Sequence, residues 1–309
     1  MLKRGVKAVW KSCWPLLVWG LVAFSGCNRR VSNPETPLPP SDRIDVPTFG
    51  QPNTLEVATW NIETFPMLGG QTVEDVVEIM LDLKVDIYAL EEITDASAFR
   101  NIYQNLPHHS GRLANFQSGG NLRTGVIYDT TVVELVSDSV LFDNDYDFPR
   151  PAYRAYFRLK SRPQLNFSLY VLHLKAFGDP ESEGRRRRAV QKLKAFLDTD
   201  AGHGGDPDVI LAGDWNDELT DPPAHNIFLP FLSDSLNYCV LTDSLARQGN
   251  EFSFIKSPFS FLDHLIASRS FKNQVRGWVV DVLEIDQAFN AYLAEVSDHR
   301  PVAVRFNLP

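Results

Sequence analysis

The stretch Ile210-Leu-Ala-Gly-Asp-Trp-Asn-Asp217 combines a short apolar strand with a polar end. Its apolar residues stop at Gly213, and Asp214 and Asn216 follow with one residue between them. Because side chains alternate along an extended segment, Asp214 and Asn216 are expected on the same side. A carboxylate that takes a proton from water and a carboxamide that holds the nucleophile or a phosphate oxygen suit phosphoryl transfer. The same residue types are common in tight turns, so the stretch needs support from the rest of the chain.

Alternating and short apolar runs predict strands along the remaining chain. They cover residues 55–61, 86–90, 124–128, 132–136, 153–159, 167–174, 261–267 and 302–306, with 124–128 and 132–136 paired with each other. Thr72 is expected to cap a helix that places Val73, Val76, Val77 and Met80 on one face, and a second helix is expected over residues 183–197. Strands outnumber helices, and hairpin spacings occur alongside β–α–β spacings. The predicted fold is therefore an α/β (α+β) four-layer sandwich, with two packed mixed β-sheets flanked by helices.

Polar residues recur at or near the ends of the predicted strands. They are Asn61, Glu91, Glu92, His173, Asp214, Asn216, Asp263, His264, Asp298 and His299. Such repetition indicates one shared cleft. The set contains carboxylates, carboxamides and histidines, and it includes no cysteine or serine placed as a nucleophile. Hard oxygen ligands in this number favour Mg²⁺, or alternatively Mn²⁺, over zinc.

In this order the motifs resemble the endonuclease/exonuclease/phosphatase superfamily, the fold of pancreatic-type deoxyribonuclease, abasic-site endonucleases and neutral sphingomyelinases. The resemblance runs from about residue 54 to the C-terminus. It implies that Glu92 is the principal metal ligand, which Asp298 could assist. Asp214 would activate the attacking water, positioned by Asn61 and Asn216.

The resemblance also assigns the residues around the phosphoryl group. His299, paired with Asp263, would stabilise the pentacovalent oxyanion, and His173 would face the leaving group. Arg150, in Phe-Pro-Arg-Pro, corresponds to a phosphate-contacting arginine. Glu91 stands where the family has Gln, and the sequence favours a solvated carboxylate at this strand end.

The N-terminal residues have the order of a secretory signal. Basic residues precede a short apolar run, which ends in Ser-Gly-Cys27 and resembles a bacterial lipobox. We expect residues 1–26 to be a lipoprotein signal peptide and Cys27 to carry lipid in the membrane, with an uncleaved anchor helix as the alternative. A Pro-rich tether with nothing to bury would span residues 27–52, and the catalytic domain residues 53–309. The predicted location is outside the cytoplasm, in the periplasm or at the cell surface.

Charge bears on the choice of substrate. The formal net charge is −9, and removing residues 1–26, which hold four basic and no acidic residues, takes it to −13. An acidic protein is not an obvious binder of polyanions, although a bound cation inverts the field at its site. Loss of Cys13 with the signal and lipidation of Cys27 would leave Cys239 as the last free thiol, so no intramolecular disulfide is expected.

The sequence therefore predicts a monomeric, Mg²⁺-dependent phosphodiesterase, with nucleic acid as substrate and DNA favoured over RNA. A phospholipid phosphodiesterase of the sphingomyelinase type, or a phosphatase acting on a phosphorylated small molecule, is the alternative. An exposed apolar hairpin over residues 252–261 would support the phospholipid hypothesis. A binding module without catalysis is a third reading, which the complete set of residue types disfavours. The run Arg185–Arg188 is interpreted as a solvated helix face paired with Asp179, Glu181 and Glu183.

Overall fold

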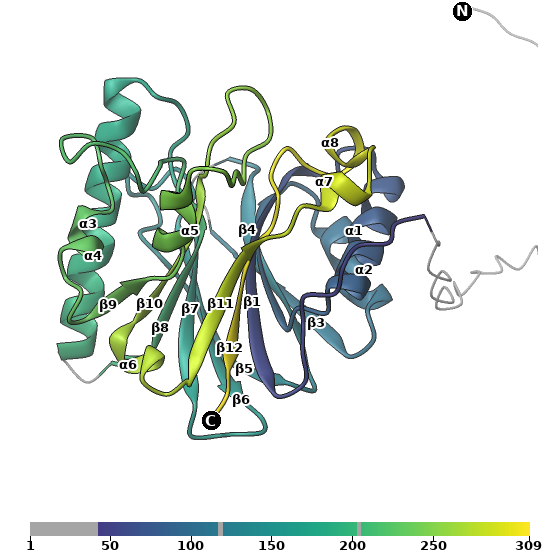
Figure 1. Ribbon diagram of the computed structural model, residues 1–309, viewed down its shortest axis with the longest axis horizontal. Helices are drawn as coiled ribbons and strands as arrows, with labels where there is room; N and C mark the ends of the chain where they lie inside the picture. The colour runs from purple at the N-terminus through teal and green to yellow at the C-terminus, as the bar shows by residue number, and fades with distance from the viewer. Residues whose placement is uncertain (1–42, 117–119, 203–204) are drawn as a thin grey trace, which may run out of the picture. The chain divides into compact units, whose positions relative to one another are not determined.

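The protein was analysed as a computed structural model, which describes residues 43–116, 120–202 and 205–309. Two six-stranded sheets pack against each other, and helices cover their outer faces (Figure 1). This arrangement confirms the predicted sandwich of two mixed sheets flanked by helices. Within the described residues, no helix is both long enough and apolar enough to cross a membrane.

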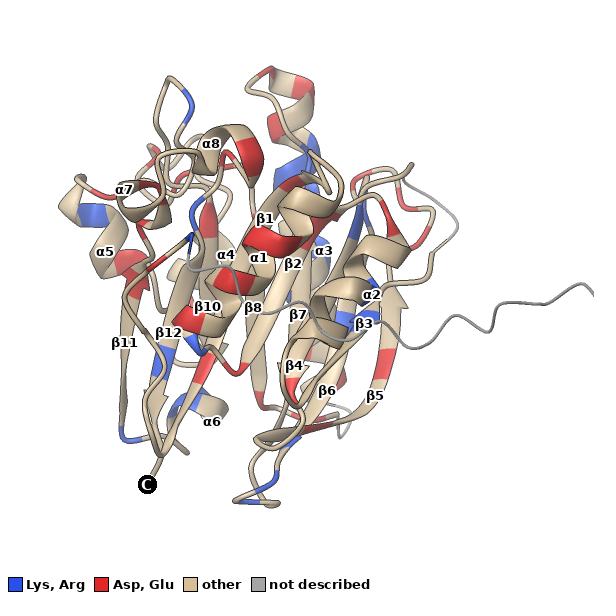
Figure 2. Ribbon diagram, turned by 90° about the vertical axis from the view of Figure 1, so that its right-hand side faces the viewer, with Lys and Arg blue, Asp and Glu red and all other residues tan. Residues whose placement is uncertain are grey.

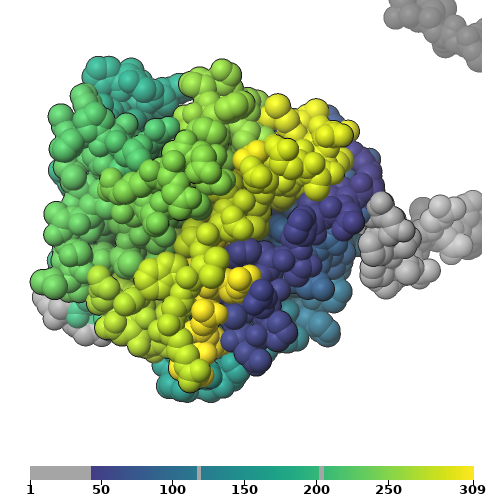
Figure 3. All heavy atoms as spheres, in the orientation of Figure 1, coloured from purple at the N-terminus to yellow at the C-terminus, as the bar shows by residue number. Residues whose placement is uncertain are grey.

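The first sheet has the strand order β11-β12-β1-β2-β4-β3. Its members are β1 (Thr54–Phe65), β2 (Ile87–Ile93), β3 (His109–Leu113), β4 (Arg123–Asp129), β11 (Gly277–Val282) and β12 (Val302–Asn307). β1 and β2 run parallel, and the other neighbouring pairs are antiparallel. Because β1 pairs with β12, the beginning and the end of the domain lie side by side, as the surface in Figure 3 shows.

The second sheet has the order β5-β6-β7-β8-β10-β9. It consists of β5 (Val133–Leu141), β6 (Ala152–Leu159), β7 (Asn166–His173), β8 (Val209–Asp214), β9 (Tyr238–Val240) and β10 (Asp263–Ser268). Here β7 and β8 form the parallel pair. Each sheet thus has one parallel pair near its centre, flanked by antiparallel strands.

Helices α1 (Gly70–Leu83) and α2 (Ala96–Asn105) cover the outer face of the first sheet (Figure 2). The long helix α3 (Pro180–Gly202) and the short α4 (Leu229–Leu232) cover the second sheet. Four further short helices are α5 (Asp243–Gln248), α6 (Arg269–Lys272), α7 (Ile285–Ala288) and α8 (Tyr292–Glu295). Of these, α7 and α8 contribute to the apolar cluster beneath α1.

Both faces of β1 are apolar because each faces a separate hydrophobic layer. Leu55 and Val57 belong to the core shared with the second sheet, whereas Ala58 and Trp60 belong to the core beneath α1. These four side chains are fully buried, and burying one Val or Leu stabilises a fold by about 2 kcal/mol. The strand is thereby held firmly at the centre of the sandwich, where it carries Asn61.

Two local predictions were wrong. Thr72 does not cap α1, whose N-cap residue is Gly69; instead Thr72 lies inside the helix, accepts a hydrogen bond from Leu68 N at 2.9 Å and donates to Glu295 O at 2.8 Å. Residues 124–128 and 132–136 do not pair, because β4 joins the first sheet and β5 joins the second. Sequence proximity favoured a hairpin here, but the chain crosses between the sheets instead.

The prediction that the tether has nothing to bury is wrong for its last part. Ile44, Val46 and Phe49 are buried against the cluster beneath α1. The backbone of this segment is also held, since Ile44 N donates to Glu78 Oε1 at 2.9 Å and Val46 N donates to an α1 carboxylate at 3.1 Å. Ile44, Val46 and Phe49 are single apolar residues in a Pro-rich segment, and this pattern did not indicate that they would be buried. The predicted signal peptide, Cys27 and the start of the tether lie outside the described residues.

The two parallel strand pairs place the polar residues at one edge of the sandwich. In the first sheet Asn61 of β1 is in register with Glu91 of β2. In the second sheet Asp214 of β8 is in register with His173 of β7 on one side and with Asp263 of β10 on the other. The strand ends of both sheets therefore meet, as the sequence predicted.

Candidate active site

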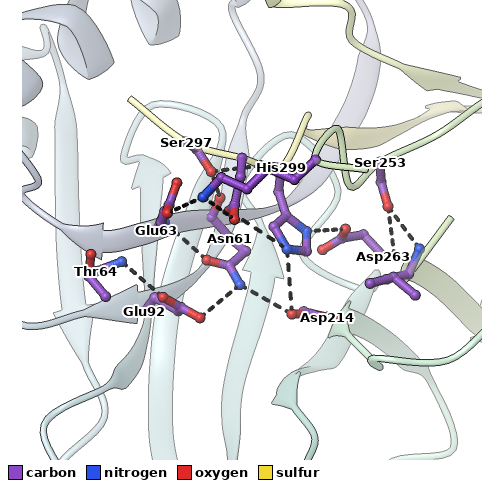
Figure 4. Close-up of polar contacts among 12 residues, drawn as sticks. Asn61, Glu63, Thr64, Glu92, Asp214, Ser253, Asp263, Ser297 and His299 are labelled. Carbon is purple, nitrogen blue, oxygen red and sulfur yellow. Dashed lines mark hydrogen bonds and ion pairs between the residues drawn. The ribbon is translucent and has the colours of Figure 1, made fainter. Parts of the chain in front are cut away.

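A histidine–aspartate pair forms one side of the site (Figure 4). His299 Nδ1 lies 2.7 Å from Asp263 Oδ2, and both side chains are buried. Burial lowers the pKa of His299, but the carboxylates of Asp263, Asp214 and Asp298 outweigh it and raise that pKa to about 10. The imidazolium is therefore charged at neutral pH and offers its other N–H to a ligand in the cleft.

Asp214 ends β8 beside this imidazolium. Its Oδ1 accepts a hydrogen bond from Asn216 N at 2.9 Å, and its Oδ2 accepts one from Asn61 Nδ2 at 3.1 Å. His299 Nε2 is 3.9 Å from Asp214 Oδ2. Burial raises the pKa of Asp214 to about 6, and the charge of His299 opposes this rise. A carboxylate whose pKa lies near neutrality suits a general base.

The Asn61 side chain connects the two sheets. Its Nδ2 donates to Asp214 Oδ2 and also lies 3.3 Å from Glu92 Oε1, and its Oδ1 accepts from Glu63 N at 3.0 Å. Ser297 Oγ donates to the Asn61 carbonyl at 2.6 Å. Figure 4 shows the carboxamide between the two carboxylates. Asn61 thus fixes the spacing between the predicted base and the predicted metal ligand.

Glu92 is held with its carboxylate toward the cleft. Its Oε2 accepts from Thr64 N at 2.9 Å, and its side chain keeps 19% exposure. The backbone φ of Glu92 is 63°, a left-handed conformation that is unusual for a glutamate and typical of functional positions. The strained backbone turns Glu92 out of the strand alternation that buries Glu91.

The site offers carboxylates that could hold a divalent metal ion. Among residues 43–116, 120–202 and 205–309, no group of three His, Cys, Asp or Glu side chains could hold a metal ion. Zinc needs three or four such ligands, whereas Mg²⁺ is held by one or two carboxylates together with waters and substrate phosphates. Glu92 is a partly exposed hard donor of this kind.

Asp298, the second predicted ligand, has a cationic neighbour. Lys256 Nζ lies 2.8 Å from Asp298 Oδ2 and 2.6 Å from Glu63 Oε1. Glu63 Oε2 is buried and has no hydrogen-bond partner. Burial raises the pKa of Glu63, and Asp298 adds to this rise. Lys256 therefore offsets part of the negative charge that Asp298 would offer to a metal ion.

His173 and Arg150 face the same carboxylates from the second sheet. His173 Nε2 is 3.6 Å from Asp214 Oδ2 and 3.7 Å from Glu92 Oε1. Burial, with help from Arg150 and His299, lowers the pKa of His173 well below its usual value, so the ring is neutral and makes no true ion pair. Its buried Nδ1 has no partner among the described residues.

Arg150 is held by its guanidinium. Nη2 donates to the Leu174 carbonyl at 2.7 Å, the same carbonyl that accepts from Asn216 Nδ2 at 3.2 Å. Burial lowers the pKa of Arg150 to about 10, against the pull of Asp214 and Glu92, so the residue remains charged. Its buried Nε has no partner within the described chain, which suits a group that contacts an anion.

Glu91 departs from its prediction. It is not solvated at the strand end but fully buried between the sheets, where Oε1 accepts from Thr59 Oγ1 at 3.1 Å. Burial raises its pKa well above the usual value, and Asp263 and Asp214 raise it further. The sequence could not show that the second sheet covers this position.

Three supporting groups escaped the sequence analysis. Ser253 Oγ accepts from Asp263 N at 3.0 Å, and the Tyr292 hydroxyl donates to the His299 carbonyl while it accepts from Trp60 Nε1 at 2.9 Å. Lys256 is the third. All three lie in irregular segments or short helices, where no periodic pattern indicates their neighbours.

Comparison with protein families agrees with this geometry. The endonuclease/exonuclease/phosphatase family model matches residues 58–299, which include every predicted site residue. A search of curated protein sequences gave no match.

Solved structures of low sequence identity share the fold. An endonuclease/exonuclease/phosphatase family protein from Bacteroides thetaiotaomicron has a TM-score of 0.60 at 19% identity, covering 83% of this chain and 95% of that one. The human Nocturnin catalytic domain with bound sulfate has a TM-score of 0.60 at 19% identity, covering 86% and 97%. A mannosyl-6-phosphatase from Bacteroides thetaiotaomicron has a TM-score of 0.58 at 18% identity, covering 82% and 99%.

A nucleic-acid complex is among the similar structures. TDP2 from D. rerio, complexed with a single-strand DNA product, has a TM-score of 0.58 at 14% identity, covering 82% of this chain and 99% of that one. At such identities the likeness concerns the fold alone.

Proposed function

Because this chain belongs to the endonuclease/exonuclease/phosphatase family, whose members hydrolyse phosphate esters and generally depend on divalent metal ions, we propose that it is a Mg²⁺-dependent nuclease. Its substrate would be a phosphodiester in nucleic acid, with DNA favoured over RNA. Lipidated Cys27 would hold it at a membrane outside the cytoplasm. The proposal covers both endonuclease and exonuclease action.

One observation supports the chemistry most strongly. The charged His299, paired with Asp263 at 2.7 Å, and the carboxylate of Asp214 face each other across 3.9 Å. An acid and a base with pKa values of about 10 and about 6 can both be in their active forms at neutral pH. This is what hydrolysis by an activated water requires.

The acid–base groups would activate the water and stabilise the transition state. Asp214 takes the proton of the attacking water, and Asn61 and Asn216 hold Asp214 in position. His299 donates a hydrogen bond from Nε2 to the phosphoryl oxygen as negative charge develops there. Asp263 keeps the His299 ring oriented and charged.

The remaining groups bind the phosphate and the leaving oxygen. Arg150 offers its unpartnered Nε to a phosphate oxygen, and neutral His173 lies on the leaving-group side. Glu92, with Asp298 as a second donor, would hold Mg²⁺, which neutralises phosphoryl charge when bound.

A sugar phosphatase is the second candidate, because the mannosyl-6-phosphatase covers 82% of this chain, the same share as TDP2 in complex with a single-strand DNA product. The lipid alternative has less support. Of the phenylalanines in residues 252–261, only Phe259 is mostly exposed, at 57%, while Phe252 and Phe254 are partly covered and Phe261 is buried. This segment does not present the apolar hairpin that the lipid reading predicts.

A substrate panel separates these candidates. The full chain, purified in detergent with Mg²⁺, would be assayed on single-stranded DNA, supercoiled plasmid, single-stranded RNA, mannose 6-phosphate and sphingomyelin. We expect nucleic acid to be cleaved fastest, and His299→Ala to abolish the cleavage. Hydrolysis of mannose 6-phosphate or sphingomyelin without cleavage of any nucleic acid would overturn the proposal.

The proposed anchor has its own test. Cells producing the wild-type chain and Cys27→Ser would be fractionated, and the protein followed by immunoblotting. We expect the wild type in the membrane fraction with a lipid mass on Cys27. An unmodified wild-type chain of full length would contradict lipidation and favour an uncleaved anchor helix.

A further inference from the structure

Two exposed aromatic rings stand at the second-sheet side of the site. Tyr146, in the connection between β5 and β6, is 66% exposed, and Phe177, between β7 and α3, is 73% exposed. Each ring has a cation stacked on it: Arg185 Cζ lies 4.2 Å from the Tyr146 ring centroid, and Lys175 Nζ lies 4.2 Å from that of Phe177. Exposed apolar rings that lie close together often mark a surface that binds a partner or a ligand.

Arg185 and Lys175 differ from the neighbouring arginines of α3 in their ion pairing. Within the run Arg185–Arg188, Arg186 pairs with Asp217, Arg187 with Glu183 and Arg188 with Asp147 and Glu181. The predicted pairing is confirmed for Arg187 with Glu183 and for Arg188 with Glu181. It is wrong for Arg186, which is buried against Asp217, and for Asp179, which instead accepts hydrogen bonds from Glu181 N and Ser182 N. Among the described residues Arg185 makes no ion pair with a carboxylate, and its buried Nε has no hydrogen-bond partner. Lys175 likewise makes no ion pair within this part of the chain.

The backbone segments that carry the two rings are held by side chains of α3. Arg186 Nη1 donates to the carbonyls of Lys175 and Phe177 at 2.9 and 2.7 Å, while its Nε is bonded to Asp217 Oδ2 at 2.7 Å. Arg185 donates to the Tyr146 carbonyl. Both aromatic segments are therefore pinned to the first turns of α3.

Phe177 also has a strained backbone. Its φ is 81°, in the left-handed region that a bulky side chain seldom adopts. An exposed phenylalanine held at this φ gains no burial that would offset the strain, so a binding role accounts for it better than packing does.

The rings adjoin the residues that handle the phosphate. Lys175 and Phe177 lie two and four residues after His173, and Tyr146 lies four residues before Arg150 in one connection. The Arg150 guanidinium is bonded to the Leu174 carbonyl at 2.7 Å. Burial lowers the pKa of Lys175, and the charges of Arg185 and Arg150 lower it further.

We propose that Tyr146, Arg185, Phe177 and Lys175 form a subsite, the ring–cation rim, that binds nucleotides flanking the scissile phosphate of a single-stranded nucleic acid. Proteins hold such strands by stacking bases on aromatic rings and placing cations along the phosphates. Two ring-and-cation units suit a ligand in which bases and phosphates repeat, whereas a single sugar phosphate offers one of each. The inference rests on the proposed nuclease function. It adds that the substrate is single-stranded and that its bases are bound by stacking on the two rings.

The test compares two strands of equal length that differ only in their bases. One is a single-stranded DNA oligonucleotide, and the other carries an abasic residue at each position near the cleavage site. We expect the wild-type protein to show a kcat/KM about tenfold or more higher on the strand with bases. Phe177→Ala and Tyr146→Ala would remove this preference by lowering kcat/KM on the strand with bases toward the value for the abasic strand.

A control variant and a charge variant accompany these measurements. Leu236→Ala removes another exposed side chain, 84% accessible and outside the site, and would leave the preference intact. Arg185→Ala would weaken binding of both strands and reduce the salt dependence of their affinity. Cleavage of both strands at equal rates by the wild type would overturn the ring–cation rim while leaving the nuclease function standing. Cleavage of neither strand, with plasmid and RNA cleaved, would overturn this inference alone, and cleavage of no nucleic acid at all would refute the nuclease function as well.

Discussion

Asn61 donates from the first sheet to Asp214 in the second, with Nδ2 3.1 Å from Oδ2. The same nitrogen lies 3.3 Å from Glu92 Oε1. One carboxamide therefore sets the distance between the predicted base and the predicted metal ligand, which come from different sheets.

Replacement of Asn61 should damage catalysis far more than folding. For Asn61→Ala we expect kcat to fall about 100-fold, because Asp214 loses its orienting donor. The free energy of unfolding should fall by only about 1 kcal/mol, because the buried Asp214 carboxylate keeps its hydrogen bond from Asn216 N and its charged neighbour His299. Single-turnover cleavage and thermal melts would measure the two effects. A variant with wild-type kcat would show that Asn61 has no positioning role.

The pH–rate profile should have two limbs. Since Asp214 must be ionised to act as a base, kcat/KM is expected to rise as the pH increases through about 6. Since His299 must be charged, kcat/KM should fall as the pH increases through about 10. In Asp263→Asn the main group that raises the His299 pKa is absent, so the falling limb should move to lower pH. An unmoved limb would assign that ionisation to another group.

Two adjacent arginines provide a stability comparison. Arg186 is buried and paired with Asp217, whose pKa burial raises to about 7. Arg186→Ala leaves that carboxylate without its cation, and we expect a loss of about 3–5 kcal/mol in the free energy of unfolding. Arg187 is half-buried at the surface and pairs with Glu183 one helical turn away, so Arg187→Ala should cost about 0.5 kcal/mol. Urea unfolding of both variants would check this, and equal losses would contradict the buried role of Arg186.

The Phe177 side chain is expected to lower the free energy of unfolding while it contributes to binding. Glycine adopts a φ of 81° without strain, so Phe177→Gly should be at least as stable as the wild type, with a gain of about 1 kcal/mol. The same variant should lose the preference for strands with bases. Thermal melts beside cleavage assays would show both changes. A clear loss of stability would mean that the ring packs into the fold rather than serving a ligand.

The sequence predicted the parts of the site that depend on strand periodicity. Asp263 and His299 meet because β10 begins at Asp263 and β12 begins shortly after His299. Alternation does not place Asn216, since β8 ends at Asp214 and Asn216 follows it with a φ of 53°. Glu91 could not be predicted in the same way, since its burial depends on the second sheet covering β2. The strand β3 was missed because His109-Ser-Gly-Arg-Leu113 has no apolar alternation. Lys256 and Tyr292 reach the site from segments that only the completed fold brings near.

The most direct test of the account is cleavage of single-stranded DNA by the wild type, Asp214→Asn and Asp243→Asn, each with Mg²⁺ and with EDTA. Asp243 lies in α5 and pairs with Arg247 at the surface, so it provides a matched control outside the site. We expect Mg²⁺-dependent cleavage by the wild type and Asp243→Asn, and a loss of about 10²–10⁴-fold in Asp214→Asn. Cleavage by Asp214→Asn at the wild-type rate would contradict the assignment of Asp214 as the base.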